Sequence, residues 1–409
     1  MAGTVKWKQP FHQARRILAK FWLKCHPWVT IIGITGSYGK TNTTRAITTV
    51  LAEKYRTLPT DLNLDTIYNL PITILKLRPW HQKLVLEYGV DHKGEMDFHL
   101  SLVKPFMGVI TGINPTHSDP ELLGSLAGVI KEKSKLLQAL PKEGWAIFNW
   151  DDKNVRKMAK KTKAQILSYG LDRQADFGAE KIKVSFSGTE FILGYQNKRI
   201  KIKTGLIGRH FVHACLAATA VGIIQGLTWS EIKRGLALLR PLKGRLSIEK
   251  GPRGSILLND ALRANPASTM AGLQVLADLP TRPPAGQRIA VLGEMGELGR
   301  LAEKSHRQVG QKVAEVKIDY LIAVGPLQKF VAEEAIKGGM KKEKVFWVED
   351  VHQAAEILAK ILKKGDLFYL KGSLLRHMER VLLLLQKKRV ACRTVFCHNY
   401  HQCDICPEL

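Results

Sequence analysis

A glycine-rich loop between an apolar strand and a helical stretch constrains the fold of this chain more than any other feature. Residues 30–34 are rich in β-branched side chains, residues 35–41 read Thr-Gly-Ser-Tyr-Gly-Lys-Thr, and a helical pattern follows over residues 41–55. Such a loop points backbone N–H groups and a helix N-terminus at phosphate, while its lysine adds positive charge and its threonine can bind Mg²⁺. A chance Gly-Lys-Thr turn is disfavoured, because strand, loop and helix stand in the required order. The sequence therefore predicts a nucleotide site formed by Gly36, Ser37, Gly39, Lys40 and Thr41.

The rest of the chain has the alternating pattern of an α/β protein. From residue 29 onward, short apolar runs alternate with amphipathic segments, which is typical of a parallel sheet covered by helices. Residues 181–204 differ, because apolar and polar residues alternate around Gly and Asn turns and predict an antiparallel addition. The strands that we expect are 29–34, 83–90, 108–113 and 145–149 in a first series, and 255–258, 288–292, 320–324, 344–348 and 367–370 in a second.

Two strand series predict two principal domains. The fold class is therefore α/β, with a central P-loop-type ATPase domain on a parallel sheet and a C-terminal Rossmann-like domain. The Pro-rich stretch 279–287 falls within the second series, so we place the boundary near residues 240–244. The predicted parts are a basic amphipathic N-terminal helix (1–28), a central ATP-binding domain (29–243), a Rossmann-like domain (244–387) and a Cys/His-rich tail (388–409).

The charge balance is strongly basic, with 63 Lys and Arg against 36 Asp and Glu and a formal net charge of +27. Such a charge attracts anions in general, including phosphorylated metabolites, anionic lipids and nucleic acids. Nucleic-acid binding is disfavoured, because the body of the chain has neither an aromatic-interleaved basic stripe nor a zinc finger of standard spacing. The longest apolar stretches, such as 214–224, are shorter than the roughly 18 to 20 residues that cross a bilayer, so we expect a cytoplasmic protein.

The first 28 residues form a basic segment with six Lys or Arg and no acidic residue. They lack the long apolar region and the cleavage site of an export signal. Apolar side chains recur among basic ones at helical spacing, a pattern that suits the surface of an anionic membrane. A basic helix docked on the neighbouring domain explains the same pattern equally well. The apolar residues concerned are Phe11, Ile17, Leu18, Phe21 and Trp22.

Further motifs follow the loop in an order that resembles the Mur ligases. The strict Walker pattern would place glycine at Ile34, but the spacing from Gly33 to Thr41 is similar to the ATP loop of this family. The resemblance covers about residues 29–386. Its later motifs are Glu87-Tyr-Gly with Gly94-Glu95, Asn114-Pro-Thr-His117, the segment around Lys133, Asn149-Trp-Asp-Asp152, Gly208-Arg-His210, Gly244-Arg245, Asn259-Asp260, Glu294 with His306, and Lys371-Gly-Ser373 with Met378-Glu379.

The resemblance implies an ATP-dependent ligase that makes an amide bond through an acyl phosphate in peptidoglycan synthesis, and so serves cell-wall biogenesis, cell shape and cell division. Lys40, Lys133 and His117 would be its catalytic residues. Thr41 and Glu87 would bind Mg²⁺ at the phosphates, and His117 with a carbamate formed on Lys133 would bind a second ion. The other nucleotide contacts that the resemblance implies are Asn149, His210, Arg245 and Asp260.

Each metal-binding position also has a simpler interpretation when taken alone. Glu87 fits a strand-end acid, His117 an ordinary loop histidine, and Lys133 an exposed helix lysine. Lys131 lies two residues before Lys133 and is a second candidate for the same role. The order of the motifs behind a phosphate loop favours the functional interpretation, because charged groups that converge on such a site are functional candidates.

The motifs of the second half most resemble the family member that adds D-alanyl-D-alanine to a UDP-N-acetylmuramoyl-tripeptide, which implies these two substrates. The chain departs from that member at Phe211, His213, Leu262 and Arg263. Its phosphate loop begins at about residue 33, so we expect it to lack the family's N-terminal uridine-binding domain. The alternatives are a divergent ligase for another carboxylate and amino acid, or an ATP-binding subunit that needs a protein partner in place of that domain.

Four of the six cysteines lie in the last 18 residues, at Cys392, Cys397, Cys403 and Cys406. With two nearby histidines they offer more thiolate and imidazole ligands than the four that a tetrahedral zinc site needs. Only Cys403 and Cys406 have the spacing of a zinc knuckle. Zinc binding is therefore one interpretation of the tail, and an unstructured segment or redox-labile thiols is the other.

Overall fold

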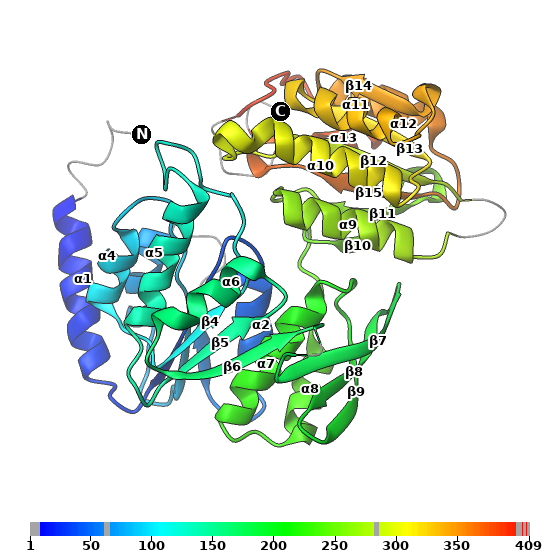
Figure 1. Ribbon diagram of the computed structural model, residues 1–409. Helices are drawn as coiled ribbons and strands as arrows, with labels where there is room; N and C mark the ends of the chain where they lie inside the picture. Colours follow the sequence, from blue (N-terminus) through cyan, green and yellow to red (C-terminus); the bar gives the residue numbers. More distant parts are fainter. Residues whose placement is uncertain are drawn as a thin grey trace. The chain divides into compact units, whose positions relative to one another are not determined.

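The computed structural model describes residues 9–60, 66–172, 174–281 and 286–397, together with Cys403 and Cys406. The chain forms two compact units, which Figure 1 shows in blue to green and in yellow to red. The first unit contains Met1–Ile182, Glu190–Thr204 and His210–Leu239, and the second contains Lys183–Thr189, Gly205–Arg209 and Arg240–Leu409. Each unit has its own largely parallel sheet with helices packed on it, which confirms the predicted α/β class.

The first unit is built on a nine-stranded sheet in the order β2-β3-β1-β4-β5-β6-β7-β8-β9. β1 pairs in parallel with β3 and with β4, so the carboxyl ends of these three strands meet at one edge. The structure ends β3 at Glu87 and β4 at Ile110, earlier than we expected, because the chain leaves the sheet there and enters loops. The bounds are β1 (Thr30–Thr35), β2 (Thr57–Pro59), β3 (Lys83–Glu87), β4 (Met107–Ile110), β5 (Trp145–Asn149) and β6 (Gln165–Gly170).

The last three strands of this sheet are β7 (Phe177–Ser185), β8 (Gly188–Tyr195) and β9 (Lys198–Thr204). Two residues separate β7 from β8, and two separate β8 from β9. Two-residue connections are those of β-hairpins, whose strands are antiparallel neighbours. The antiparallel addition predicted for residues 181–204 is therefore present.

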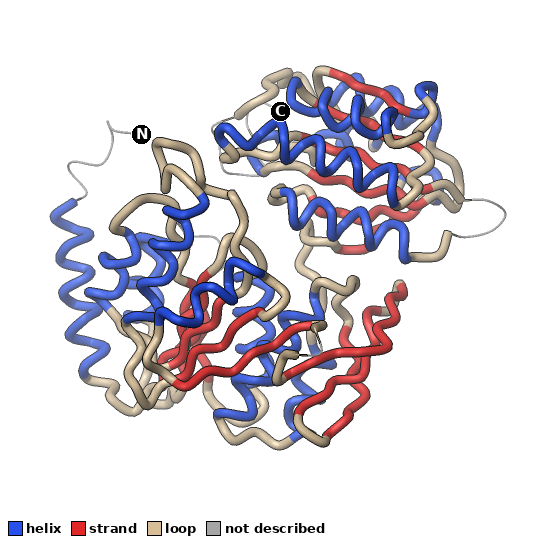
Figure 2. Tube along the Cα trace, in the orientation of Figure 1, coloured by secondary structure: helices blue, strands red, loops and turns tan. Residues whose placement is uncertain are grey.

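Helices cover both faces of the first sheet (Figure 2). Leu84 and Leu86 of β3 belong to one hydrophobic cluster with Leu70 and Leu136 from two helices of that face. Val85 points to the opposite face, because side chains alternate along a strand. One face carries α3 (Thr66–Leu75), α4 (Glu95–Leu102), α5 (Leu126–Gln138) and α6 (Lys153–Met158), and the other carries α2 (Lys40–Leu51), α7 (Phe211–Ile224) and α8 (Trp229–Leu238).

Helix α1 (Gln9–Lys24) docks on α3 and α4 with one face and exposes the other. The Arg16 guanidinium donates to the Phe98 carbonyl oxygen at 2.8 Å and lies 3.4 Å from the centre of the Phe98 ring. On the opposite face, four apolar side chains are between 54 and 72% exposed: Phe11, Ile17, Leu18 and Phe21. Docking therefore explains only part of the amphipathic pattern. Among the described residues, no helix has both the length and the apolar character needed to span a membrane.

The second unit has a six-stranded sheet in the order β10-β11-β15-β12-β13-β14. All pairs are parallel except β10 with β11, which are antiparallel. The predicted Rossmann-like arrangement is therefore present, with one antiparallel strand at its edge. The bounds are β10 (Ser247–Lys250), β11 (Ile256–Asp260), β12 (Arg288–Gly293), β13 (Tyr320–Val324), β14 (Val345–Val348) and β15 (Leu367–Lys371).

Helices also flank the second sheet. Ile289 and Val291 of β12 pack in one cluster with Val351 and Leu358 of α12. A Cβ at Gly272 of α9 would lie 2.0 Å from the Tyr369 hydroxyl, so this helix approaches β15 closely because it has glycine there. The helices are α9 (Pro266–Asp278), α10 (Ala302–Glu315), α11 (Lys329–Lys337), α12 (Val351–Ile361) and α13 (Arg380–Leu385).

Candidate active site

The loop that joins β1 to α2 has the geometry of a phosphate cradle. Gly36 and Gly39 have φ angles of 154° and 81°, which favour glycine, and a Cβ at Gly36 would lie 2.1 Å from Thr111 Oγ1. No side chain among the described residues caps the N-terminus of α2, so the N–H groups of its first turn can bind phosphate oxygens. Lys40 Nζ donates to the Gly36 carbonyl oxygen at 2.8 Å, which places its charge over the loop.

The ends of neighbouring strands hold this loop in place. Thr111 Oγ1 donates to the Tyr38 carbonyl oxygen, and the Tyr38 hydroxyl donates to Asp152 Oδ2 at 3.1 Å. Asn149 Nδ2 donates to the Thr111 carbonyl oxygen at 2.7 Å. Asn149 is buried, and its hydrogen bond holds Thr111, the residue that supports the loop. Its contact with adenine stays a prediction.

Glu87 and Thr41 lie at the same edge as the loop. Glu87 is the last residue of β3 and pairs in register with Ile34, one residue before β1 ends at Thr35. Thr41 lies in the first turn of α2. A carboxylate and a hydroxyl are hard oxygen ligands of the kind that Mg²⁺ prefers. The positions fit the predicted magnesium site, and the metal itself stays a prediction.

His117 and Lys133 converge on one backbone carbonyl. The Val90 carbonyl oxygen lies 3.2 Å from His117 Nδ1 and accepts a hydrogen bond from Lys133 Nζ at 3.3 Å. His117 has a φ of 69°, a left-handed conformation that non-glycine residues rarely adopt and that is common at functional sites. The structure therefore brings together the two residues predicted to bind the second metal ion, although they come from a loop and from α5.

Lys133 is fully buried, with 0% of its surface exposed. Burial lowers the pKa of its amine well below the ordinary value, and the positive charge of Lys40 lowers it further, against the opposing effect of three acids. The simpler interpretation as an exposed helix lysine is therefore wrong, and Lys131 is the exposed one. A neutral amine is the form that reacts with CO₂, and the carbamate itself stays a prediction.

Two acidic residues near Lys133 were missed by sequence reasoning. Glu132 is buried, and its Oε1 accepts from the backbone N–H groups of Gly94 and Met96 at 3.0 and 2.9 Å, which fixes the start of α4. Asp91 follows Val90 and acts electrostatically on Lys133. Burial alone would raise the Asp91 pKa, but hydrogen bonds with His92 and Glu95 outweigh it and lower the pKa. The position of Glu132 directly before Lys133 was the available signal.

The residues around the start of α7 include two of the departures from the family pattern. His210 precedes α7, and its ring lies 4.0 Å from the ring of Phe211, which is buried. His213 Nε2 lies 2.6 Å from Asp151 Oδ2. Burial would raise the Asp151 pKa, but the hydrogen bond with His213 and two backbone N–H donors lower it. Phe211 therefore packs in the unit and His213 hydrogen-bonds to Asp151 in this chain, and the nucleotide contact of His210 stays a prediction.

In the second unit, Asp260 lies in a buried polar cluster at the end of β11. Its Oδ2 accepts from Lys371 Nζ at 2.6 Å and from the Tyr369 hydroxyl at 3.0 Å. Burial raises the pKa of Asp260 and lowers the pKa of Lys371, and their ion pair offsets part of both effects. Arg245 acts electrostatically on both groups. The structure thus adds Lys371 and Tyr369 as partners of Asp260, and the sequence assigned no role to either. The nucleotide contacts of Arg245 and Asp260 stay predictions.

The turn that carries Arg245 depends on another departure, Leu262. Gly244 has a φ of 73°, and a Cβ there would lie 2.8 Å from Leu262 Cγ. The Leu262 backbone N–H also donates to the Gly244 carbonyl oxygen at 3.3 Å. Leu262 therefore packs against this turn. Arg263 is exposed, and nothing in the structure explains its presence.

Two sequence families match the chain in the order of its units. The Mur ligase middle domain matches residues 34–222, and the Mur ligase, glutamate ligase domain matches residues 244–374. The UDP-N-acetylmuramoyl-tripeptide--D-alanyl-D-alanine ligase of Bacillus subtilis (strain 168) is 31% identical over 353 residues, which cover 86% of this chain and 75% of that ligase. The chain belongs to the Mur ligase family. The resemblance predicted from the motifs is thereby confirmed, together with the class of ATP-dependent ligase.

Other relatives extend this comparison. The enzyme of the same name from Escherichia coli (strain K12) is 34% identical over 307 residues, which cover 74% of this Mur ligase chain and 66% of that enzyme. This chain thus spans about two thirds to three quarters of the length of these two relatives. A crystal structure of MurF from Acinetobacter baumannii superposes with a TM-score of 0.82 at 27% identity and covers 92% of this chain and 81% of its own. MurF from Thermotoga maritima in complex with ADP has the same fold, with a TM-score of 0.79 at 22% identity, over 92% of this chain and 84% of its own.

Proposed function

We propose that this Mur ligase joins D-alanyl-D-alanine to a UDP-N-acetylmuramoyl-tripeptide in peptidoglycan synthesis, with ATP converted to ADP and phosphate. The support is the convergence of His117 and Lys133 on the Val90 carbonyl, at 3.2 and 3.3 Å, in the unit that also contains the Lys40 loop. The D-alanyl-D-alanine-adding relatives support the choice of substrates. The reaction would take place in the cytoplasm, where ATP is available.

The chemistry has two steps that balance without a further reactant. A carboxylate oxygen of the tripeptide attacks the γ-phosphorus of ATP, the bond to the β,γ-bridging oxygen breaks, and ADP leaves. The amine of D-alanyl-D-alanine then attacks the acyl phosphate, phosphate leaves, and the amine loses one proton. Little covalent chemistry falls to the protein, so positioning and neutralisation of charge on the transferring phosphoryl group dominate catalysis.

The residues of the first unit divide these tasks. Lys40 and the N–H groups at the start of α2 would bind the phosphates. Thr41 and Glu87 would hold Mg²⁺, and His117 with a Lys133 carbamate would hold a second Mg²⁺, which when bound supplies positive charge at the phosphoryl group and the substrate carboxylate. His117 Nδ1 lies 3.2 Å from the Val90 carbonyl oxygen, a contact that fixes the orientation of the ring. In the second unit, Arg245 and Asp260 are the groups proposed to reach the nucleotide.

A coupled assay tests this function directly. The full chain with ATP, Mg²⁺, UDP-N-acetylmuramoyl-tripeptide and D-alanyl-D-alanine is expected to release one phosphate for each pentapeptide formed. Phosphate release and the mass of the product are measured in the same reaction. Omission of either substrate should reduce phosphate release to the background of ATP hydrolysis. Bound ATP without any product from the isolated chain would contradict the proposal and favour a subunit that needs a protein partner.

A divergent ligase for another carboxylate and amino acid is the second candidate. It is favoured by Leu262, which packs against the turn carrying Arg245, and by the exposed Arg263, both departures from the D-alanyl-D-alanine-adding pattern. A panel of carboxylates and amines in the same assay separates the two candidates. Turnover with another pair at more than about tenfold higher kcat/KM, a difference of 1.4 kcal/mol, would select the divergent ligase.

We also propose that the uncovered face of α1 binds an anionic membrane surface. Phe11, Ile17, Leu18 and Phe21 are 54 to 72% exposed, and Lys20 and Lys24 are exposed on the same helix. Apolar side chains with flanking cations are the combination that anionic lipid surfaces bind. The chain is expected to sediment with vesicles that contain phosphatidylglycerol and less with vesicles of phosphatidylcholine alone.

The variant Leu18→Gln/Phe21→Gln should weaken this vesicle binding at least about tenfold, because it removes two side chains that would enter the lipid. Leu238→Gln is the matched control, since Leu238 is 61% exposed on α8 and outside the proposed face. Equal loss of binding in both variants, or no binding by the parent chain, would refute the membrane contact.

A further inference from the structure

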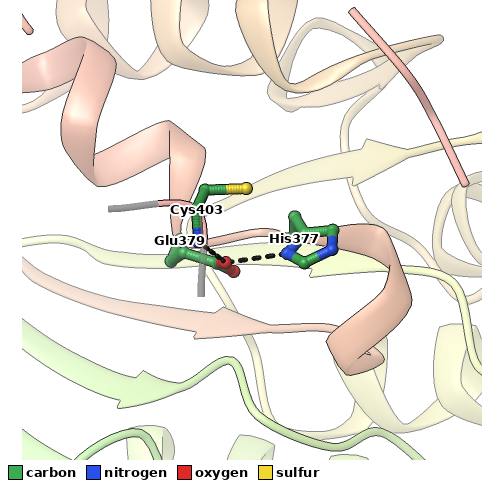
Figure 3. A group of neighbouring side chains, drawn as sticks. All are labelled: His377, Glu379 and Cys403. Carbon is green, nitrogen blue, oxygen red and sulfur yellow. Dashed lines mark hydrogen bonds and ion pairs between the residues drawn. The ribbon is translucent and has the colours of Figure 1, made fainter. Parts of the chain in front are cut away.

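Two glutamate side chains join segments that are far apart in the sequence by accepting backbone N–H groups. In the second unit, Glu379 Oε1 accepts from the Cys403 N–H at 3.2 Å and lies 2.9 Å from His377 Nδ1, as Figure 3 shows. Ligand atoms of these three residues lie within 4.8 Å of one another. The hydrogen bonds attach the tail to the turn before α13, and zinc binding by the tail cysteines stays a prediction. The other glutamate, Glu132, lies in the first unit beside the candidate active site.

The segment that Glu132 holds is the loop of residues 88–94, which joins β3 to α4. This loop passes through the candidate active site. Its Val90 carbonyl oxygen is the atom on which Lys133 Nζ and His117 Nδ1 converge, at 3.3 and 3.2 Å. The position of this one carbonyl therefore sets how closely the lysine and the histidine approach each other.

Glu132 reaches the end of this loop from α5. Its Oε1 accepts from the Gly94 N–H at 3.0 Å and from the Met96 N–H at 2.9 Å. Gly94 directly precedes α4 and has no side chain with which to cap that helix, so Glu132 supplies the missing acceptor. A negative charge at the start of a helix is also favourable. Only 4% of Glu132 is exposed, so water does not replace this acceptor easily.

The loop is tied to the start of α4 by a second carboxylate. Glu95, in the first turn of α4, accepts through Oε2 from the N–H groups of Asp91 and His92 at 2.9 and 3.1 Å. These two residues directly follow Val90. A displacement of the start of α4 would therefore carry Glu95 with it and move the Val90 carbonyl.

The second carboxylate oxygen of Glu132 has a partner of its own. Oε2 accepts from Lys135 Nζ at 2.7 Å, and the same ammonium donates to Asp97 Oδ2 of α4 at 2.6 Å. A buried carboxylate is costly unless it is paired and hydrogen-bonded, and Glu132 is both. Oε1 thus holds the loop and Oε2 holds the ion pair, so substitutions can separate the two tasks.

We propose that Glu132 is a positioning residue of the ligase, which fixes the β3–α4 loop to α5 and so sets the separation between Lys133 and His117. The inference rests on the proposed function, in which those two residues hold a second Mg²⁺. Without the carboxylate, the N–H groups of Gly94 and Met96 would lack an acceptor, and the loop would have to move to expose them to water. Ligands must stay within about 0.5 Å of their productive places, so this movement would weaken metal binding.

The test compares Glu132→Ala with Glu132→Gln in the full chain. Glu132→Ala removes the acceptor and should raise the Mg²⁺ concentration for half-maximal phosphate release about 10- to 100-fold, the usual effect of losing a group that supports metal ligands. Glu132→Gln keeps an oxygen of the same reach and should stay within about threefold of the parent chain. Lys135→Met is the matched control, since it removes only the ion pair, and should stay within about twofold.

Mn²⁺ binding provides a measurement that does not need turnover. Electron paramagnetic resonance with a non-hydrolysable ATP analogue should count two bound Mn²⁺ on the parent chain, and Glu132→Ala should bind the second at least about tenfold more weakly. A parent chain that binds both ions but makes no pentapeptide would contradict the proposed substrates and leave the positioning role intact. A parent chain without the second ion, or a Glu132→Ala chain that is less stable to heat but keeps the parent's affinity for it, would overturn the positioning role.

Discussion

Replacement of Lys40 by alanine is expected to lower the turnover number about 10²- to 10³-fold, since that is the usual cost of removing one charge-stabilising donor from a reacting group. Lys40 Nζ lies 2.8 Å from the Gly36 carbonyl oxygen, which places its charge over the phosphate loop. The loss should appear in kcat more than in KM, because negative charge moves on the γ-phosphate mainly in the transition state. Steady-state phosphate release with saturating substrates measures it.

Lys54→Ala is the matched control for this variant. Lys54 lies shortly after the same helix, and its Nζ donates to the Gly226 carbonyl oxygen at 2.7 Å, away from the loop. It should keep turnover within about twofold, as surface substitutions away from special features usually do. A Lys40→Ala protein with the turnover of the parent chain would remove the phosphate loop from the mechanism.

Lys133→Ala should have a comparably large effect, with a loss of at least about 10²-fold in turnover, because it removes the ligand that we propose for a second Mg²⁺. The loss should be partly reversed by short carboxylates such as acetate, which can occupy the place of the carbamate. Carbon-13 NMR of the parent chain in labelled bicarbonate should show one carbamate resonance that is missing from the variant. Lys131→Ala is the matched control on α5, since Lys131 is exposed and Lys133 is 0% exposed.

The pH dependence of the proposed carbamate follows from the lowered pKa of Lys133. Burial, with the charge of Lys40, favours the neutral amine, which reacts with CO₂ above its pKa in the folded chain. As the pH falls through that lowered pKa, the amine is protonated, the carbamate resonance should disappear, and turnover should fall with it. An activity that persists unchanged in CO₂-free buffer, with no labelled carbamate, would rule out the modification.

The order of elements and the phosphate loop could be predicted from the sequence, because both depend on local patterns. Short apolar runs rich in β-branched residues, and apolar residues that alternate with polar ones, indicate strands. The glycines at residues 36 and 39 supply φ angles that other residues rarely adopt. Strand ends were predicted less well. Residues 88–90 looked like a continuation of β3, but they form a loop that presents the Val90 carbonyl to His117 and Lys133. Local pattern does not distinguish an apolar strand from an apolar loop that is buried by its neighbours.

The sequence by itself determined the class of fold, the Lys40 loop and the family, since these rest on residue types at fixed spacing along one segment. Only the tertiary structure decided between Lys131 and Lys133, paired Asp260 with Lys371 at 2.6 Å, and placed Cys403 beside His377. Each of these outcomes depends on burial and on contact between segments far apart in the chain. The pKa of a lysine, or the ligand set of a metal, is set by what surrounds it in space, and spacing along the sequence does not contain that information.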